Sequence, residues 1–157
     1  MKIGRFEITL HNHGTMRLDG GAMFGSVPKS LWSRKVEVDE NNCVMLGTNS
    51  LLIRDGSRAF LVDTGLGDKW GEKESRIYSI SQTADEELGF NRSEITDIII
   101  THLHFDHGGG LTRFKNAQAK EIELCYPRAR LYLQKANFDT ASKPNARERA
   151  SYLPENV

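Results

Sequence analysis

The hydrophobic pattern of the chain predicts several short strands. Apolar and polar side chains alternate imperfectly from Ile3 to Leu10, which predicts a first strand. Two further strand-like runs, Val44–Arg54 and Ala59–Val62, are joined at Asp55-Gly56, a dipeptide typical of hairpin turns. The run Asp97–Thr101 has the continuous apolar character of a strand that is buried on both faces.

Helix-like spacing separates these runs. Apolar residues recur at steps of three and four from Ile77 to Leu88, so we expect a helix there that ends at Gly89. Ala129–Leu133 predicts another strand, and Gln134–Asp139 predicts the start of another helix. Strands that alternate with helices indicate an α/β (α+β) fold.

The rest of the chain gives no sign of a second domain. The glycine-rich segment Leu18–Trp32 is expected to form a loop. We find no internal repeat and no linker, and 157 residues are the usual length of one domain. Residues 1–157 therefore belong to one domain.

Charge and cysteine usage narrow the classes of function. The 21 basic and 21 acidic residues cancel, which argues against a nucleic-acid groove or a membrane-surface patch. Cys43 and Cys125 lie in apolar runs, as buried thiols of a reducing compartment do. The N-terminal segment lacks the apolar stretch of a signal peptide, and every apolar run is far below membrane-spanning length. We expect a cytoplasmic protein with no nucleic-acid or membrane partner.

Candidate metal ligands are concentrated in the segment THLHFDHGGG. Three of the five histidines and one aspartate fall within six residues: His102, His104, Asp106 and His107. Imidazole nitrogens and carboxylate oxygens are ligands for zinc, manganese, iron and cobalt. In extended backbone His102 and His104 point the same way, while Asp106 and His107 approach from beyond a turn. Two pairs of ligands at one strand end indicate two metals. The three glycines that follow let the chain pass closely around the site and begin the next helix.

This segment resembles the HxHxDH motif of the metallo-β-lactamase-fold hydrolases. Asp63-Thr64-Gly65, at the end of the predicted hairpin, looks like the Asp-x-Gly element of the same superfamily. The segments LDGGAMFGSVPKSLWSRK and NARERASYLPEN are similar to the quorum-quenching lactonases and their YtnP-like relatives. The resemblance implies a four-layer αββα sandwich, of which this chain supplies about the N-terminal half.

The resemblance also implies roles for single residues. His102 and His104 would bind one divalent metal, and Asp106 and His107 a second, with zinc as the expected ion and manganese or iron as alternatives. Two such metals activate water and polarise a carbonyl, and Asp106 would also pass a proton to the leaving oxygen. Asp63 either orients the ligands through hydrogen bonds or only caps a turn.

Two other groups of residues have competing interpretations. Met23 and Phe24 either line an apolar pocket for an acyl chain or take part in ordinary packing. His11-Asn12-His13 repeats the two-residue spacing, but no further ligand follows it. We expect this tripeptide to be the end of a strand, with no role at the metal site.

The sequence departs from the family after His107. The family's further ligands lie downstream, yet no histidine follows His107 here. Each metal would then have two protein ligands, whereas a catalytic zinc usually has three. An apolar face of the sheet would also stay uncovered, because the second half of the sandwich is missing. We therefore expect the N-terminal portion of a longer enzyme, inactive alone, whose partner is the missing C-terminal half or a second copy.

Three functions fit these observations. The first is a dinuclear, metal-dependent hydrolase that opens lactone or similar ester bonds of a small molecule, like an N-acyl homoserine lactonase. The second is an iron-dependent oxidoreductase of the same fold, and the third is a half-domain that binds metal without turnover. The GGAMFG segment favours the lactonase group, whereas the absence of downstream ligands favours the third function.

Overall fold

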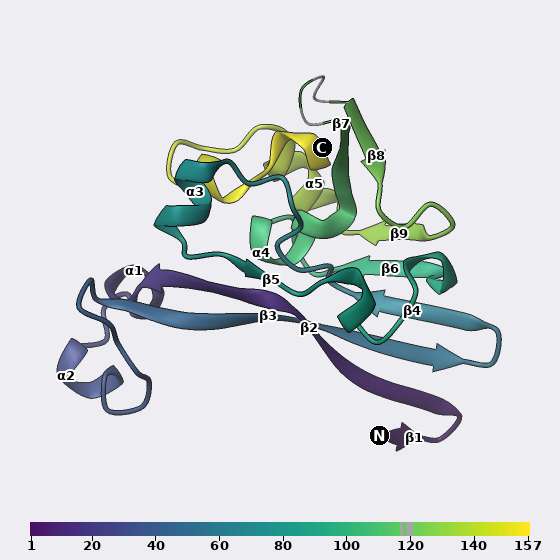
Figure 1. Cartoon of the computed structure of the whole chain (residues 1–157), viewed down its shortest axis with the longest axis horizontal. Coiled ribbons are helices and arrows are strands. Elements are labelled where there is room, and N and C mark those ends of the chain that lie inside the picture. The colour runs from purple at the N-terminus through teal and green to yellow at the C-terminus, as the bar shows by residue number, and fades with distance from the viewer. Residues whose placement is uncertain (117, 119–120) are drawn as a thin grey trace.

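A seven-stranded sheet is the framework of the computed structural model, which describes residues 1–116, 118 and 121–157 (Figure 1). Its strands are β1 (Lys2–Ile3), β2 (Phe6–Asp19), β3 (Cys43–Asp55), β4 (Arg58–Val62), β5 (Ser81–Gln82), β6 (Asp97–Ile100) and β9 (Arg130–Leu133). The order is β1-β2-β3-β4-β6-β9, with β5 beside β2. Strands β1 to β4 pair antiparallel, whereas β4, β6 and β9 run parallel. Strands β7 (Thr112–Asn116) and β8 (Glu121–Leu124) form a separate pair.

Short helices connect the strands. They are α1 (Gly20–Phe24), α2 (Lys29–Trp32), α3 (Glu72–Ile77), α4 (Phe105–Gly108) and α5 (Lys135–Ser142). Single 3₁₀ turns cover Asp85–Glu87, Arg92–Glu94, Gly109–Leu111, Arg149–Ser151 and Pro154–Asn156. Within the described ranges, no helix has the length and apolar character needed to cross a membrane. The mixture of strands and helices confirms the expected α/β (α+β) class.

Several predicted elements form where the pattern placed them. The hairpin between β3 and β4 turns at Asp55-Gly56, and Gly56 has φ +57°, a conformation that glycine adopts without strain. Strand β9 and the start of α5 also match the prediction. Of the two free cysteines, Cys125 is buried as expected, whereas Cys43 is half-buried.

One face of the sheet carries the main core. Leu52, Leu61, Ile98 and Ile100 are buried on this face. They pack with side chains from the connecting loops and from α5: Ile95, Leu111, Tyr126, Ala141 and Tyr152. Burial of each such side chain contributes about 1.5–3 kcal/mol, so this cluster holds α5 and the C-terminal segment on the sheet.

The opposite face of the sheet is apolar and open. Cross-strand pairing puts Leu10, Leu51, Val62, Ile99 and Tyr132 in one row across five strands. Ile99 is 39% exposed, although the residue on each side of it is buried. The described part of the chain thus leaves the second face of β6 open at Ile99, and the prediction of a strand buried on both faces is wrong there. The expectation of an uncovered apolar face is confirmed.

The prediction of a helix from Ile77 to Leu88 is wrong. Helix α3 ends at Ile77, Ser79 has φ +45°, and Ser81–Gln82 form β5 against Gly14 and Thr15 of β2. Only a single 3₁₀ turn, Asp85–Glu87, precedes the buried Leu88. The apolar residues of this irregular segment therefore make separate contacts with the sheet. These tertiary contacts outweigh the helical pattern of the sequence.

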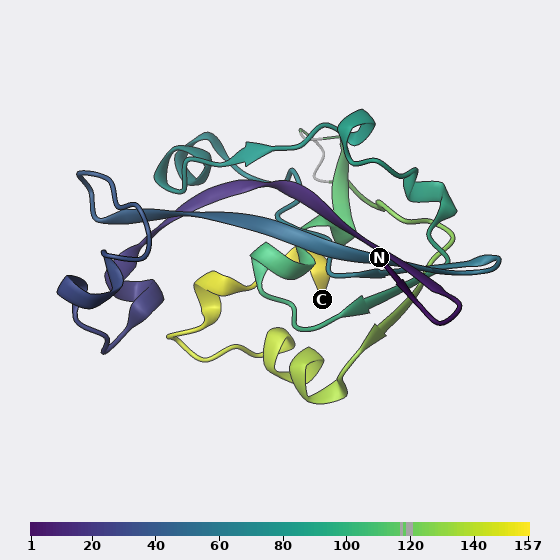
Figure 2. The same ribbon diagram turned by 90° about the horizontal axis from the view of Figure 1, so that it is seen from below.

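The predictions for the N-terminal third also need correction. The chain turns at Gly4 (φ +57°), and β2 then continues far beyond Leu10 to Asp19. His11-Asn12-His13 thus lies inside a strand and not at its end. The segment predicted as a loop, Leu18–Trp32, contains α1 and α2 instead. Figure 2 shows these two helices at the far end of the β2–β3 ribbon, away from β6 and β9.

Candidate metal centre

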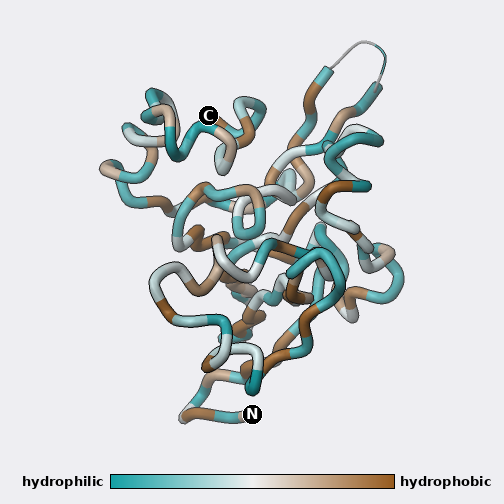
Figure 3. Tube along the Cα trace, turned by 90° about the vertical axis from the view of Figure 1, so that its left-hand side faces the viewer, coloured by the Kyte–Doolittle hydropathy of each residue, from teal (hydrophilic) through white to brown (hydrophobic). Residues whose placement is uncertain are grey.

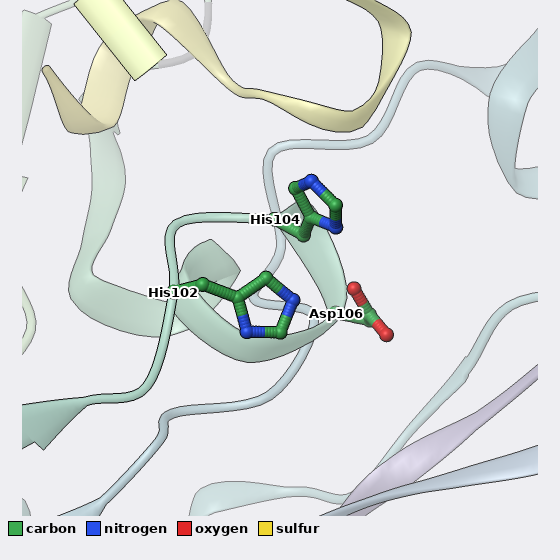
Figure 4. A group of neighbouring side chains, drawn as sticks. All are labelled: His102, His104 and Asp106. Atoms are coloured by element: carbon green, nitrogen blue, oxygen red, sulfur yellow. The ribbon is translucent and has the colours of Figure 1, made fainter. Parts of the chain in front are cut away.

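The candidate ligands lie in the loop that follows β6. His104 has extended backbone (φ −60°, ψ 151°), and Asp106 and His107 lie in the single turn of α4. This change from extended to helical backbone directs side chains from both parts toward one another. Figure 4 shows His102, His104 and Asp106 around a common space. Their candidate ligand atoms all lie within 4.8 Å of one another.

His107 joins this group through two carboxylates. Its Nδ1 donates to Asp63 Oδ2 at 2.9 Å, and its Nε2 lies 3.3 Å from Asp106 Oδ2. Its ring centroid is 4.0 Å from that of His102. The structure therefore brings together all five side chains that the sequence placed at the site, from two separate segments of the chain.

Asp63 is held in place by its backbone and its carboxylate. It has φ +62°, a left-handed conformation that aspartate tolerates better than most residues. Its backbone N–H donates to the carbonyl of Ile99 at 3.0 Å. Its carboxylate accepts hydrogen bonds from the backbone N–H and the hydroxyl of Thr101, at 2.9–3.0 Å, besides the bond from His107. Asp63 is thus more than the cap of a turn.

Thr101 links Asp63 to His102. The Thr101 hydroxyl has one proton, which it donates to the Asp63 carboxylate, so it accepts the hydrogen bond from His102 Nδ1 at 3.1 Å. His102 then carries its proton on Nδ1 and has Nε2 free as a lone-pair donor. Thr101 directly precedes the histidine segment, but nothing in the local sequence indicates this linking role.

The charges of these groups are coupled. The hydrogen bonds to Asp106 and then to Asp63 raise the pKa of His107 to about 9. Burial raises the pKa of Asp63 and of Asp106. The hydrogen bond and charge of His107, together with the hydrogen bonds of Thr101 to Asp63 and the charge of His102 near Asp106, outweigh burial, so the net pKa of both is lowered. Burial, followed by the neighbouring His107 and His104, lowers the pKa of His102. Two ionised carboxylates therefore flank the imidazole of His107, a place where positive charge is stabilised, whether it is a proton on the ring or a cation that displaces that proton.

Backbone contacts join the two turns that carry the site. Thr64 N donates to His107 O at 2.7 Å, and Gly110 N donates to Gly65 O at 3.1 Å. A Cβ on Gly110 would lie 2.2 Å from the Thr64 carbonyl oxygen, so only glycine fits there. The triple glycine thus permits the close approach that we expected, but it leads into a single 3₁₀ turn and β7, not into a helix.

The C-terminal segment supports the loop from outside. Asn137 of α5 accepts a hydrogen bond from Leu103 N at 2.8 Å, and Asn156 donates to Gly108 O at 2.8 Å. Tyr152 forms a β-bridge with His104 and packs edge-on against its ring. Sequence reasoning missed these three residues, because nothing in their local pattern connects them with a segment more than 30 positions away.

The family model of the Metallo-beta-lactamase superfamily matches residues 44–156, which contain this whole cluster. The chain belongs to the metallo-beta-lactamase superfamily. The family recognised from the HxHxDH segment is thereby confirmed, and so is the sheet-rich half-fold that it implied.

Solved structures agree with this membership of the superfamily. A probable metal-dependent hydrolase from Staphylococcus aureus is 31% identical, with a TM-score of 0.89, over 99% of this chain and 56% of that one. The hydrolase AbOPH is 21% identical (TM-score 0.69; 99% and 52% covered). AidC, a dizinc quorum-quenching lactonase, is also 21% identical (TM-score 0.62; 94% and 48% covered). The chain thus spans about half the length of these relatives, and the two more distant ones show the fold alone.

The donor set fits the divalent metal that the superfamily fold uses. His102 and His104 offer nitrogen, Asp106 offers an ionised oxygen, and all three are half-buried. Such mixed nitrogen and oxygen donors suit zinc, manganese or iron. Nδ1 of His102 donates to the Thr101 hydroxyl and Nδ1 of His107 donates to the Asp63 carboxylate, so Nε2 of each ring would be the nitrogen that holds a cation.

Other residues singled out from the sequence lie elsewhere. Met23 and Phe24 belong to α1, at the end of the molecule remote from α4 (Figure 1), and Phe24 stacks on Trp32 with ring centroids 4.7 Å apart. His13 is buried and its Nε2 lies 2.7 Å from Ser50 Oγ, whereas His11 Nδ1 donates to Leu88 O at 2.6 Å. Their hydrogen-bond partners thus lie in β3 and beside the 3₁₀ turn Asp85–Glu87, not among the candidate ligands.

Proposed function

We propose that the full-length protein is a dinuclear metal-dependent hydrolase that opens lactone or similar ester bonds. The observation that carries the proposal is the convergence of His102, His104 and Asp106 within 4.8 Å, beside the pair of His107 and Asp63. Donors of this kind on one rigid turn favour a cation, and the lactonase among the structural neighbours favours ester chemistry.

Each residue has a defined task in this proposal. His102 and His104 would hold one cation, and Asp106 and His107 the other. When bound, two divalent cations supply Lewis-acid activation of water and of the ester carbonyl. Asp106, at the open side of α4, would carry a proton to the leaving oxygen, while Asp63 keeps His107 oriented. The remaining ligands would come from the chain beyond residue 157.

The test uses the full-length protein, purified with zinc or manganese. We expect two metal equivalents per chain, hydrolysis of N-acyl homoserine lactones, loss of activity with a chelator and recovery on addition of metal. The variant His104→Ala is expected to lose stoichiometric metal, whereas His11→Ala, a histidine outside the site, is the matched control. Two equivalents retained in His104→Ala would refute the ligand assignment.

A second variant tests the chemistry. Asp106→Asn keeps the size of the side chain but removes its negative charge and its ability to carry a proton. We expect kcat for lactones to fall by about 10²-fold or more. Unchanged turnover by metal-free protein would refute the mechanism.

Other outcomes would favour the alternative functions. Bound iron together with turnover that depends on oxygen would favour the oxidoreductase. Metal binding without turnover of any ester would favour the non-catalytic function.

A further inference from the structure

His104 differs from the other two candidate histidines in how its ring is held. Nδ1 of His102 is bonded to the Thr101 hydroxyl, and Nδ1 of His107 is bonded to the Asp63 carboxylate. Within the described part of the chain, neither ring nitrogen of His104 has a hydrogen-bond partner. A metal-binding imidazole is normally oriented by a hydrogen bond to the nitrogen that does not bind the metal. The ring of His104 must therefore be oriented in another way.

Two aromatic rings contact the His104 ring instead. The ring centroid of His102 lies 4.5 Å away and that of Tyr152 lies 4.9 Å away, with interplanar angles of 72° and 71°. His102 is itself a candidate ligand, so Tyr152 is the neighbour that comes from outside the ligand loop. Tyr152 also forms an antiparallel β-bridge with His104, where the backbone is extended before α4 begins. One residue thus contacts both the backbone and the ring of His104.

Tyr152 is buried within a segment that is otherwise polar. Residues 142–157 all belong to the described part of the chain, and Tyr152, at 8% exposed, is the one buried residue among them. Figure 3 shows a largely hydrophilic tube leading to the C-terminus. Such a segment has little apolar surface to bury, so its position on the core depends strongly on this one ring. The ring is buried at the point where it meets His104.

From these contacts we infer that Tyr152 is a positioning residue for the metal centre, whose ring fixes the orientation in which His104 presents its lone pair to a cation. The edge of an aromatic ring is positive and its face is negative, so an edge-on contact favours one rotation of the imidazole over others. Tyr152 acts through His104. The inference rests on the proposed function, in which His104 is a ligand.

The experiment compares Tyr152→Phe with Tyr152→Leu in the full-length protein, stripped of metal and titrated with zinc against a competing chelator. Tyr152→Phe keeps the ring and removes only the hydroxyl, which hydrogen-bonds to Asn137 and not to His104. We expect its zinc affinity to stay close to that of the wild type. Tyr152→Leu stays apolar but removes the ring, and we expect its zinc affinity to fall about 10-fold.

Tyr126→Leu is the matched control for the loss of a buried ring. Tyr126 belongs to the same core cluster and is 3% exposed, but the ion above its ring is the Arg92 guanidinium, 5.1 Å from the ring centre. We expect both leucine variants to lose stability in urea unfolding of the metal-free proteins, and only Tyr152→Leu to lose zinc affinity. Should Tyr152→Leu not fold, Tyr152→Met makes the same comparison with a side chain that fills irregular gaps.

Cobalt(II) gives a second readout, because its visible absorption spectrum depends on the geometry of the ligands. At saturating cobalt we expect an altered spectrum in Tyr152→Leu and wild-type spectra in Tyr152→Phe and Tyr126→Leu. A purely structural role of Tyr152 would lower stability and leave the spectrum unchanged.

Three results would overturn the inference: wild-type zinc affinity and cobalt spectrum in Tyr152→Leu, an equal loss of affinity in Tyr126→Leu, or an equal loss in Tyr152→Phe. A wild type that binds no zinc would refute the proposed ligand set, and the inference with it. The failure of the proposed function is therefore distinguishable from the failure of the role of Tyr152 alone.

Discussion

Among single residues, Asp63 controls which nitrogen of His107 is free. The Asp63 carboxylate accepts the Nδ1 proton of His107 and two hydrogen bonds from Thr101. In Asp63→Asn the amide group donates toward His107, which favours the tautomer with its proton on Nε2, the nitrogen that faces Asp106. We expect zinc affinity of the full-length protein, measured by chelator competition, to fall about 10–100-fold.

The control for this prediction is Asp68→Asn. Asp68 lies five residues downstream, and among the side chains that the structure describes it forms no hydrogen bond or ion pair with a histidine. Asparagine tolerates the left-handed backbone of residue 63 as aspartate does, so the backbone itself adds no strain. Equal zinc affinity in wild type and Asp63→Asn would show that Asp63 does not orient His107.

His13 makes stability depend on pH at a point far from the candidate ligands. Burial, and next the charge of Arg92, lower the pKa of His13 from 6.5 to about 4. The unfolded chain therefore binds a proton that the folded chain does not, and stability falls as the pH drops from about 6.5 to about 4. The full effect is about 3 kcal/mol.

The variant His13→Gln removes this titration and keeps a polar partner for Ser50. We expect urea unfolding of this variant to lose less stability than the wild type between pH 7 and pH 4.5. The same loss in both proteins would contradict the prediction. The sequence could not indicate this role, because the burial of His13 depends on the register of β2 with β3.

The predictability of the site also differs between residues. His102, His104, Asp106 and His107 are contiguous, so local spacing was enough to bring them together. Asp63 was found only through the resemblance, since its contact with His107 spans 44 positions. Asn137 and Asn156 depend on the packing of α5 and the C-terminal segment, which short-range patterns do not contain.

At the level of elements, the turn after β4 and the turn after α4 depend on each other. Gly110→Ala would place a Cβ 2.2 Å from the Thr64 carbonyl oxygen, and backbone atoms cannot move aside as a flexible side chain can. We expect the free energy of unfolding of the full-length protein to fall by about 3 kcal/mol. Urea denaturation measures it.

Gly47→Ala is the matched control for this change. Gly47 lies exposed in β3, and its Cβ would meet only side-chain atoms: the Asn12 amide nitrogen at 3.1 Å, and the Asn49 amide at 3.5 Å or more, which is ordinary contact. We expect its stability to stay within about 0.5 kcal/mol of the wild type. A similar loss in both variants would mean that the close approach of the two turns contributes nothing specific.

Elements with strong local signals were the ones that the sequence predicted correctly. The β3–β4 hairpin has Asp-Gly at its turn, and β6 has a run of three isoleucines. The segment from Ile77 to Leu88 has helical spacing as well, but β5 pairs with β2 in its middle, and a tertiary contact of this kind leaves no local pattern.

At the scale of the whole molecule, the open sheet face determines how residues 1–157 behave when they are expressed alone. Leu51, Ile99 and Tyr132 are exposed on that face, so residues 1–157 expressed alone should bind a hydrophobic dye and self-associate. We also expect no lactone turnover with excess zinc, because no histidine follows His107 to complete the ligands. The full-length protein, assayed beside it, is the control; equal turnover by both would contradict the prediction.

The hydrogen bonds between the two turns also make cation loading visible in the backbone. The amide hydrogens of Thr64 and Gly110 exchange with solvent only when the turns separate. Asp63, in the first turn, accepts a hydrogen bond from His107 in the second turn. A cation held by His107 therefore raises the free energy needed to separate the two turns. Exchange at Thr64 and Gly110 should therefore slow on loading, although neither residue offers a side-chain ligand. Zinc, which is silent in optical spectra, would thus be detected through two protected amides.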